Sequence, residues 1–248
     1  MLAATLGAGC GRIGFGATRS GSVDAPAGDT VAPDGGPGCA GGYRLCDGFE
    51  TGILDPVWTL GPGVSRDTTV GHRGTSSIHA HMPPLAIGTD GYAYLAQFST
   101  LPLGDPTFYV RAWVLVSHLP TNNMEVIAAQ PTSGPPNEDG LFVESGALAV
   151  YTQYANRSKT TAMPPPAGVW FCVLWTVARD SGNAGSLTVA GELPTITLAN
   201  VQTDGTPPMT EMDFGIGFSG STVAVPEPAM DVHIDDVIVA SSPVTCAD

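Results

Sequence analysis

Apolar and polar side chains alternate along many short stretches of this chain, a period typical of half-buried β-strands. The clearest stretch is Asp231–Ala240, where β-branched residues alternate with polar ones around two adjacent acids. No stretch has the longer period of an amphipathic helix, and runs of prolines break the chain at several points. We therefore predict an all-β chain with thirteen strands, at Leu45–Glu50, Gly63–Val70, Ser76–Met82, Tyr92–Phe98, Thr107–His118, Met124–Gln130, Gly140–Glu144, Ala147–Tyr154, Val169–Arg179, Ser186–Ala190, Pro194–Val201, Met212–Phe218 and Asp231–Ala240.

The first and last of these strands are natural partners in one sheet. If they pair antiparallel, the start of the first lies beside the end of the last, which favours a Cys46–Cys246 disulfide and leaves Cys39–Cys172. The residues themselves select none of the three pairings that four cysteines permit. No Cys-x-x-Cys pair or zinc spacing is present, so two disulfides in an oxidising compartment are expected.

The N-terminal part of the chain differs in composition from the rest. Residues 1–16 resemble the tail of a bacterial lipoprotein signal peptide, with small residues leading into Cys10 as the expected lipid anchor. Residues 17–41 are rich in Gly, Ala, Pro and Asp and predict a disordered linker, because they offer little apolar surface to bury. Residues 42–248 show no comparable break and are expected to form one β-sandwich domain.

The net charge of the chain argues against some classes of binding partner. The chain has 23 acidic and 9 basic residues and a net charge of −14. An acidic protein repels phosphate backbones, so no nucleic-acid partner is expected. No stretch reaches the roughly 18 apolar residues of a membrane span, so the predicted membrane attachment is through lipid alone.

One series of segments resembles a known fold family. It consists of Phe49-Glu50, Gly74–His79, Phe108–Val116, Val169-Trp170 and Ile234–Val237. In order and spacing these segments resemble the concanavalin A-like lectin/glucanase jelly roll, which includes laminin-G-like modules. The resemblance implies a two-sheet antiparallel β-sandwich with its terminal strands paired. Members of that family bind glycans, cleave them as hydrolases or lyases, or mediate adhesion.

Alternation within the long strand suggests a glycan-binding face. Tyr109, Arg111 and Trp113 share one face, and the opposite face is uniformly apolar. Flat aromatic rings with a planar polar group between them suit a sugar. Tyr151 and Gln153 share a face of a later strand and are added to this set. The alternative interpretation is that both aromatics only pack and that Arg111 only stacks on Trp113 or pairs with a carboxylate.

Catalytic signatures are weak. The hydrolases of the resembled family carry Glu-x-Asp-x-x-Glu, which is absent here. A lyase needs a Tyr or His base, but alternation places Tyr151 and Tyr154 on opposite faces. His79 and His81 have a spacing that suits a metal, yet no third ligand is near them in the sequence. No catalytic residue is therefore assigned.

The resemblance also implies a structural calcium where the terminal strands meet. Its predicted ligands are Asp47, Glu50, Asp235 and Asp236, because calcium prefers carboxylate oxygens. The sequence as a whole predicts an exported lipoprotein of the bacterial cell envelope, at the outer membrane or surface. Its expected function is non-catalytic binding of a glycan or cell-surface polysaccharide. The alternatives are a polysaccharide lyase or glycoside hydrolase, and a structural module with no ligand.

Overall fold

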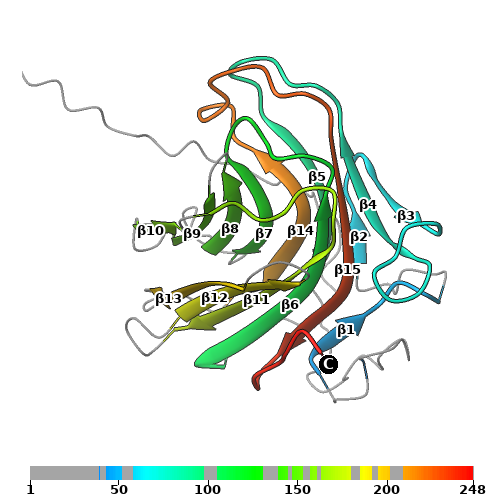
Figure 1. The fold of residues 1–248 in the computed structure, drawn as a ribbon, viewed down its shortest axis with the longest axis vertical. Helices are drawn as coiled ribbons and strands as arrows, with labels where there is room; N and C mark the ends of the chain where they lie inside the picture. Colours follow the sequence, from blue (N-terminus) through cyan, green and yellow to red (C-terminus); the bar gives the residue numbers. More distant parts are fainter. Residues whose placement is uncertain are drawn as a thin grey trace, which may run out of the picture.

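Strands alone make up the regular structure in the described part of the chain. The computed structural model describes residue 39 and residues 43–51, 58–97, 105–130, 139–144, 147–152, 157–160, 163–179, 185–191, 195–201 and 209–247. These residues form fifteen strands in two antiparallel sheets (Figure 1). The predicted anchor at Cys10 and most of the predicted linker lie outside the described residues. Within the described ranges, no helix is long and apolar enough to cross a membrane.

The eight-stranded sheet contains both the first and the last strand. Its order is β13 (Ile196–Val201), β12 (Gly185–Gly191), β11 (Phe171–Ala178), β6 (Thr107–Val116), β15 (Met230–Ala240), β4 (Ser77–Met82) and β3 (Val64–Asp67), with β1 (Leu45–Asp47) also paired to β15. β1 and β15 run antiparallel, with Cys46 opposite Ile238. The predicted pairing of the terminal strands is therefore confirmed.

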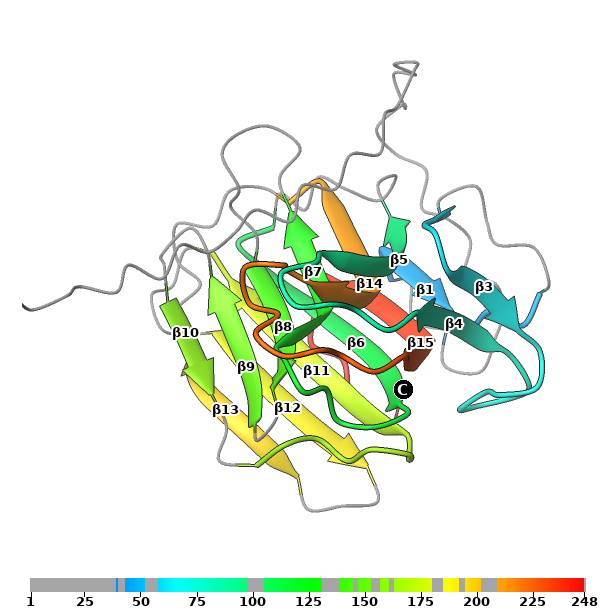
Figure 2. The same cartoon turned by 90° about the horizontal axis from the view of Figure 1, so that it is seen from above.

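The seven-stranded sheet packs on the first. Its order is β10 (Arg157–Thr160), β9 (Ala147–Thr152), β8 (Asp139–Glu144), β7 (Met124–Gln130), β14 (Glu211–Phe218), β5 (Gly91–Gln97) and β2 (Trp58–Leu60). Figure 2 shows its strands lying over those of the eight-stranded sheet. Each of the thirteen predicted strands has a counterpart, and β2 and β10 were not predicted.

The core lies between the two sheets and follows the strand alternation. On β6, the predicted apolar face is fully buried: Phe108, Val110, Ala112, Val114 and Val116. Facing side chains from the other sheet, such as Phe214 and Leu95, belong to the same cluster. Because this face is committed to the core, the other face of β6 must lie on the outside of the eight-stranded sheet.

Two disulfides are present, but their pairing differs from the favoured one. Cys39 bonds to Cys46, and Cys172 bonds to Cys246. The register of β1 on β15 explains the difference. Cys46 lies opposite Ile238. Ile238 is eight positions before Cys246, and the chain between Ile238 and Cys246 leaves the sheet. The C-terminal segment then reaches β11, where Cys172 stands on the outer face.

Candidate functional site

A β-bulge in β15 organises the outer face of the eight-stranded sheet. Asp235 pairs with Trp113 of β6 and Ile238 with Arg111, so β15 carries one extra residue between them. Asp236, at this bulge, has a φ of 48°. A bulge locally breaks the in-and-out alternation. The side chains of two consecutive acids, Asp235 and Asp236, can therefore both form hydrogen bonds with the loop that lies on the outer face.

That loop, residues 68–76, joins β3 to β4 and is fixed by the two acids. The His72 N–H donates to Asp235 Oδ2 at 2.7 Å, and His72 Nδ1 lies 2.8 Å from Asp236 Oδ2. Asp236 is 2 % exposed, and the side chain of His72 is 17 % exposed. A buried carboxylate bonded to Nδ1 orients the imidazole and fixes which nitrogen faces away from it.

The C-terminal end of the loop is held by Glu50. Its carboxylate accepts hydrogen bonds from the N–H groups of Thr75 and Ser76, at 3.1 Å and 2.8 Å. Gly74 has a φ of 111°, and a Cβ there would lie 2.6 Å from Glu50 Oε1. Glycine is therefore required both by the backbone conformation and by the close approach of the carboxylate.

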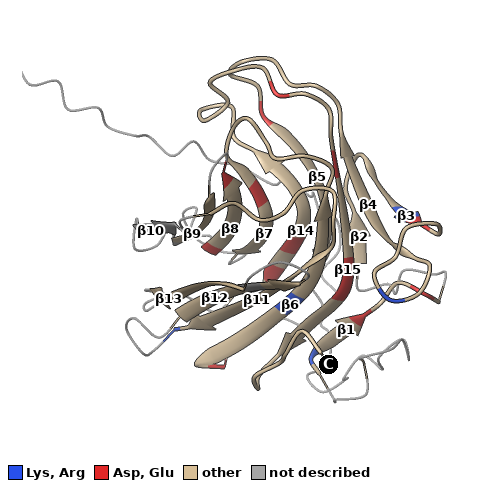
Figure 3. Cartoon of the chain, in the orientation of Figure 1, with Lys and Arg blue, Asp and Glu red and all other residues tan. Residues whose placement is uncertain are grey.

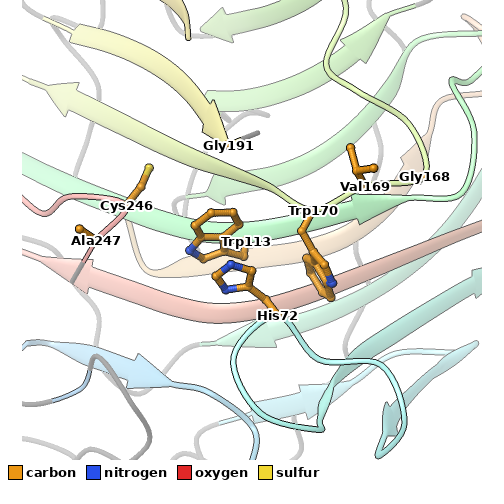
Figure 4. A pocket seen from close by; sticks show the side chains of 8 residues that line it. All are labelled: His72, Trp113, Gly168, Val169, Trp170, Gly191, Cys246 and Ala247. Atoms are coloured by element: carbon orange, nitrogen blue, oxygen red, sulfur yellow. The ribbon is translucent and has the colours of Figure 1, made fainter. Parts of the chain in front are cut away.

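The loop brings His72 onto two tryptophans. His72 stacks on Trp113 with ring centroids 3.5 Å apart and planes 13° apart, and it meets Trp170 at 5.9 Å with an angle of 63°. These rings line a groove of about 800 Å³, together with Gly168, Val169, Gly191, Cys246 and Ala247. Figure 4 shows the C-terminal pair Cys246 and Ala247 on one side and Val169 and Trp170 on the other. We call this the tryptophan groove.

Trp170 is positioned by a turn before β11. Gly168 adopts a φ of 75°, and its N–H donates to the carbonyl oxygen of Val116 at 2.8 Å. This bond ties the turn to the end of β6. Trp170 then meets the ring of His233 on β15 with centroids 6.4 Å apart. The indole is thus held between rings of two different segments and stays partly exposed.

Burial next to a second acid changes the ionisation of Asp235. Its removal from solvent, followed by the charge of Asp236, raises the pKa of this carboxyl to about 7. Hydrogen bonds from the backbone N–H groups of His72, Asp236 and Arg73 act in the opposite direction. Asp235 therefore changes its charge near neutral pH, directly beneath the loop that carries His72.

The predicted glycan face is only partly open. Trp113 lines the groove, but Arg111 is fully buried and donates from Nε to the carbonyl oxygen of Asp236 at 3.1 Å and from Nη1 to that of Thr245 at 3.4 Å. Tyr109 packs against a small second cluster that includes Cys46 and Val244. Arg111 therefore has a structural role beneath the C-terminal segment, and Tyr109 stays partly exposed.

Of the two remaining predicted glycan residues, Tyr151 belongs to the other sheet. Tyr151 lies on β9, where its ring meets Phe142 edge to face at 6.4 Å. Gln153 lies outside the described residues. Tyr151 is therefore not brought together with Tyr109, Arg111 or Trp113. Trp170 and His72 were missed as site residues. Trp170 lies near the start of the predicted strand Val169–Arg179, and His72 lies in the short glycine-containing link between the predicted strands Gly63–Val70 and Ser76–Met82.

The outer face of the seven-stranded sheet carries a polar row. Acidic residues mark β14, β7 and β8 in Figure 3. The side chain of Tyr94 covers Gly217, and its hydroxyl donates to Glu125 Oε2 at 3.1 Å. Gln130 Nε2 donates to Asp213 Oδ2 at 2.9 Å. Glu125 and Asp213 are buried, so this row is a hydrogen-bonded network on the sheet and not an open patch of charge.

Two acids near this row have shifted pKa values. Burial raises the pKa of Glu211, and a hydrogen bond with Asp213 opposes that rise. Burial also raises the pKa of Glu144 at the end of β8. Both carboxyls therefore hold their protons to a higher pH than a solvated glutamate does.

The four predicted calcium ligands bind N–H groups of the protein. Asp47 accepts from Trp58 Nε1 at 2.6 Å and from the Phe49 N–H at 2.7 Å. The Asp235–Asp236 pair holds the middle of the 68–76 loop, and Glu50 holds its C-terminal end. Among the described residues, these four do not gather into one group of potential ligands. Calcium binding by these four residues stays an untested prediction.

The histidine pair of β4 does have a third potential ligand. Asp231 of β15 lies opposite His81, and its Oδ1 is 2.8 Å from both His79 Nε2 and His81 Nδ1. Burial opposes ionisation of Asp231, but the hydrogen bonds from His81 and His79 outweigh it and lower the pKa of this carboxyl. Asp231 was missed as a partner because 150 residues separate it from His81.

Comparisons with known proteins address the fold. No family model and no curated protein matches this chain. Among solved structures, it is similar to the cellulose-induced protein Cip1, with a TM-score of 0.63 and 20 % identity over 82 % of this chain and 99 % of that one. It is also similar to a PL-14 alginate lyase from Aplysia kurodai, with a TM-score of 0.52 and 11 % identity over 73 % and 87 % of the two chains. At such low identity the likeness concerns architecture alone, and it agrees with the strand topology: the chain is a two-sheet antiparallel β-sandwich of the jelly-roll type.

Proposed function

We propose that this chain is a carbohydrate-binding jelly-roll domain that holds a neutral glycan in the tryptophan groove without cleaving it. The observation that carries the proposal is the cluster of His72, Trp113 and Trp170 around a groove of about 800 Å³. That volume lies in the range of small-ligand sites. Aromatic rings offer apolar faces to the C–H side of a sugar, and their polar edges can reach its hydroxyls.

The charge of the chain favours a neutral glycan. The net charge is −14, and Asp235 and Asp236 lie directly behind the groove. A polyuronate would approach this surface against electrostatic repulsion, whereas a neutral chain would not. The names of the two similar structures refer to cellulose and to alginate, which supports a polysaccharide as the class of ligand.

Among the described residues, those that line the groove do not include the full set of groups that cleavage needs. Hydrolysis requires two opposed carboxylates, and none of the residues that line the groove in the described part of the chain is Asp or Glu. A lyase needs a base together with a group that neutralises a carboxylate. His72, oriented by Asp236, has the form of a base, but the lining residues supply no Arg, Gln or Asn beside it.

A polysaccharide lyase is the rival function. The oriented imidazole of His72 favours it on the eight-stranded sheet, and the Tyr94–Glu125 pair favours it on the other.

The domain is also proposed to work outside the cytoplasm, supported by its two disulfides. Anchoring through a lipid on Cys10 at the cell surface remains part of this proposal, and intact mass measurement of the natural protein tests it.

The decisive experiment compares two aromatic variants on neutral polysaccharides. We expect Trp170→Ala to weaken binding by about tenfold or more, equivalent to about 1.4 kcal/mol. Tyr151→Ala, on the other sheet, serves as the matched control and should bind as the wild type does. Binding is measured by isothermal titration calorimetry, and folding is checked by circular dichroism.

Each of four results would overturn the proposal. The wild type could bind no neutral glycan at high protein concentration, or Trp170→Ala could bind as tightly as the wild type. Formation of unsaturated products, detected by their ultraviolet absorbance, would establish the lyase instead. Loss of binding in Tyr151→Ala but not in Trp170→Ala would move the site to the seven-stranded sheet.

A further inference from the structure

Three potential metal ligands meet on the outer face of the eight-stranded sheet, outside the tryptophan groove. They are His79 Nε2, His81 Nδ1 and Asp231 Oδ1, and all three atoms lie within 4.8 Å of one another. They form the only group of three or more His, Cys, Asp or Glu side chains of this kind among the described residues. Neither the proposed glycan binding nor the fold requires this arrangement.

The sheet itself assembles the group. His79 and His81 project from the same face of β4 because they are two residues apart. β15 pairs with β4 so that Asp231 lies opposite His81 and His233 lies opposite His79. Asp231 reaches both histidines, one directly across the strand pair and one diagonally. The ligands are therefore held by paired strands and not by a loop.

The distances from the two nitrogens to the carboxylate oxygen are close to those around a transition metal. Each nitrogen now lies 2.8 Å from Asp231 Oδ1. Around an ion with bonds of about 2.1 Å, neighbouring ligand atoms lie about 3.0 Å apart in an octahedral site and about 3.4 Å apart in a tetrahedral one. The two nitrogen–oxygen contacts need to open by about 0.2 to 0.6 Å. The two nitrogens, which lie within 4.8 Å of each other, must also take neighbouring positions around the same ion. Each imidazole would then carry its proton on the other ring nitrogen.

Neighbouring residues restrain the ligands from behind. The ring of His233 stacks on His79 with centroids 4.6 Å apart and planes 10° apart. His233 Nδ1 is in turn 3.2 Å from the Ser77 hydroxyl, which donates to the carbonyl oxygen of Val70. Such packing fixes ring orientation, as the outer shell of a metal site does.

We propose that His79, His81 and Asp231 bind one divalent transition-metal ion, of which zinc is the representative probe. Two imidazoles and one carboxylate suit zinc, nickel and copper better than calcium or magnesium, which prefer oxygen ligands alone. The side chains of His81 and Asp231 are 50 % and 41 % exposed. The ion would therefore keep coordination positions open to water or to an oxygen atom of another molecule.

The test titrates Zn²⁺ into the full chain carrying Cys10→Ser, so that this thiol cannot contribute; the other four cysteines are in disulfides. We expect one equivalent of zinc to bind. His81→Ala and Asp231→Asn should each weaken binding by about 100-fold, since even outer-shell changes cost 10- to 100-fold. Asp90→Asn is the matched control, because that carboxylate accepts a bond from the Gly220 N–H away from this cluster.

Cobalt spectroscopy provides a second readout. Bound Co²⁺ should show visible absorption bands that disappear in His81→Ala but remain in Asp90→Asn. The proposal is overturned if the wild type binds no zinc at millimolar concentration. It is equally overturned if either His81→Ala or Asp231→Asn binds zinc as tightly as the control. Glycan binding is measured separately with Trp170→Ala, so failure of one proposal leaves the other distinguishable.

Discussion

His72 stacks on Trp113 at a centroid distance of 3.5 Å although β15 lies between the strands from which they come. The 68–76 loop leaves β3, crosses the bulge of β15 so that His72 reaches Trp113 of β6, and returns to β4. Asp235 and Asp236 make this crossing possible by bonding to the backbone and ring of His72. The groove thus depends on a bulge, a loop and the C-terminal segment acting together.

Arg111 should matter for stability more than for recognition. It is fully buried, and its guanidinium bonds to the carbonyl oxygens of Asp236 and Thr245. Arg111→Ala would leave a cavity and buried acceptors without donors, so we expect a loss of about 3 kcal/mol in the free energy of unfolding. Urea denaturation followed by tryptophan fluorescence measures it.

The control for this variant is Arg44→Ala. Arg44 forms an ion pair with Asp105 at 2.9 Å, and its side chain is 43 % exposed. Exposed pairs contribute about 1 kcal/mol or less. Equal losses in Arg44→Ala and Arg111→Ala would contradict the structural role of Arg111.

The two disulfides should differ in what they contribute. Cys172–Cys246 spans 74 residues, whereas Cys39–Cys46 spans 7. In the chain-entropy model these loops correspond to about 4 and about 2 kcal/mol of stability. Replacing both cysteines of the longer loop by serine should therefore lower the midpoint of thermal unfolding further. The midpoints are measured by scanning calorimetry. A larger decrease on removal of Cys39–Cys46 would show that loop length does not determine which disulfide stabilises the protein more.

Asp235 should make stability depend on pH. Burial and Asp236 raise its pKa to about 7 in the folded protein, against about 3.9 in an unfolded chain. The folded state therefore holds this proton more tightly, so its contribution is fully present below about pH 4 and is lost as the pH rises to about 7. The loss is at most about 4 kcal/mol.

Asp235→Asn removes this titration. The variant loses an acceptor for the backbone of the 68–76 loop, so it should be less stable than the wild type at low pH. Its free energy of unfolding should then fall less between about pH 4 and pH 7, measured by urea denaturation across that range. If the free energy of unfolding changed with pH equally in the two proteins, Asp235 would not be the source of the pH dependence.

Much of the fold follows from local patterns. Period-two alternation locates thirteen of the strands, and the buried face of β6 follows it throughout. β2, which is three residues long, is too short for alternation to be visible. β10 is a polar four-residue strand at the sheet edge, Arg157–Thr160, and it has no apolar face to reveal it. The two adjacent acids of β15 broke the alternation, and only the bulge shows why.

The all-β class, the pairing of the two terminal strands and the division of β6 into two faces could all be predicted from the chain's residues. These features depend on side-chain periodicity and on neighbours along the strand. Other features emerged only in three dimensions. They are the disulfide partners, the burial of Arg111, the contacts of His72 with Trp113 and Trp170, and the contacts of Asp231 with His79 and His81. Each of these depends on strand register and on where a loop or terminus crosses the sheet, and such contacts join residues too far apart in sequence for any local pattern to encode.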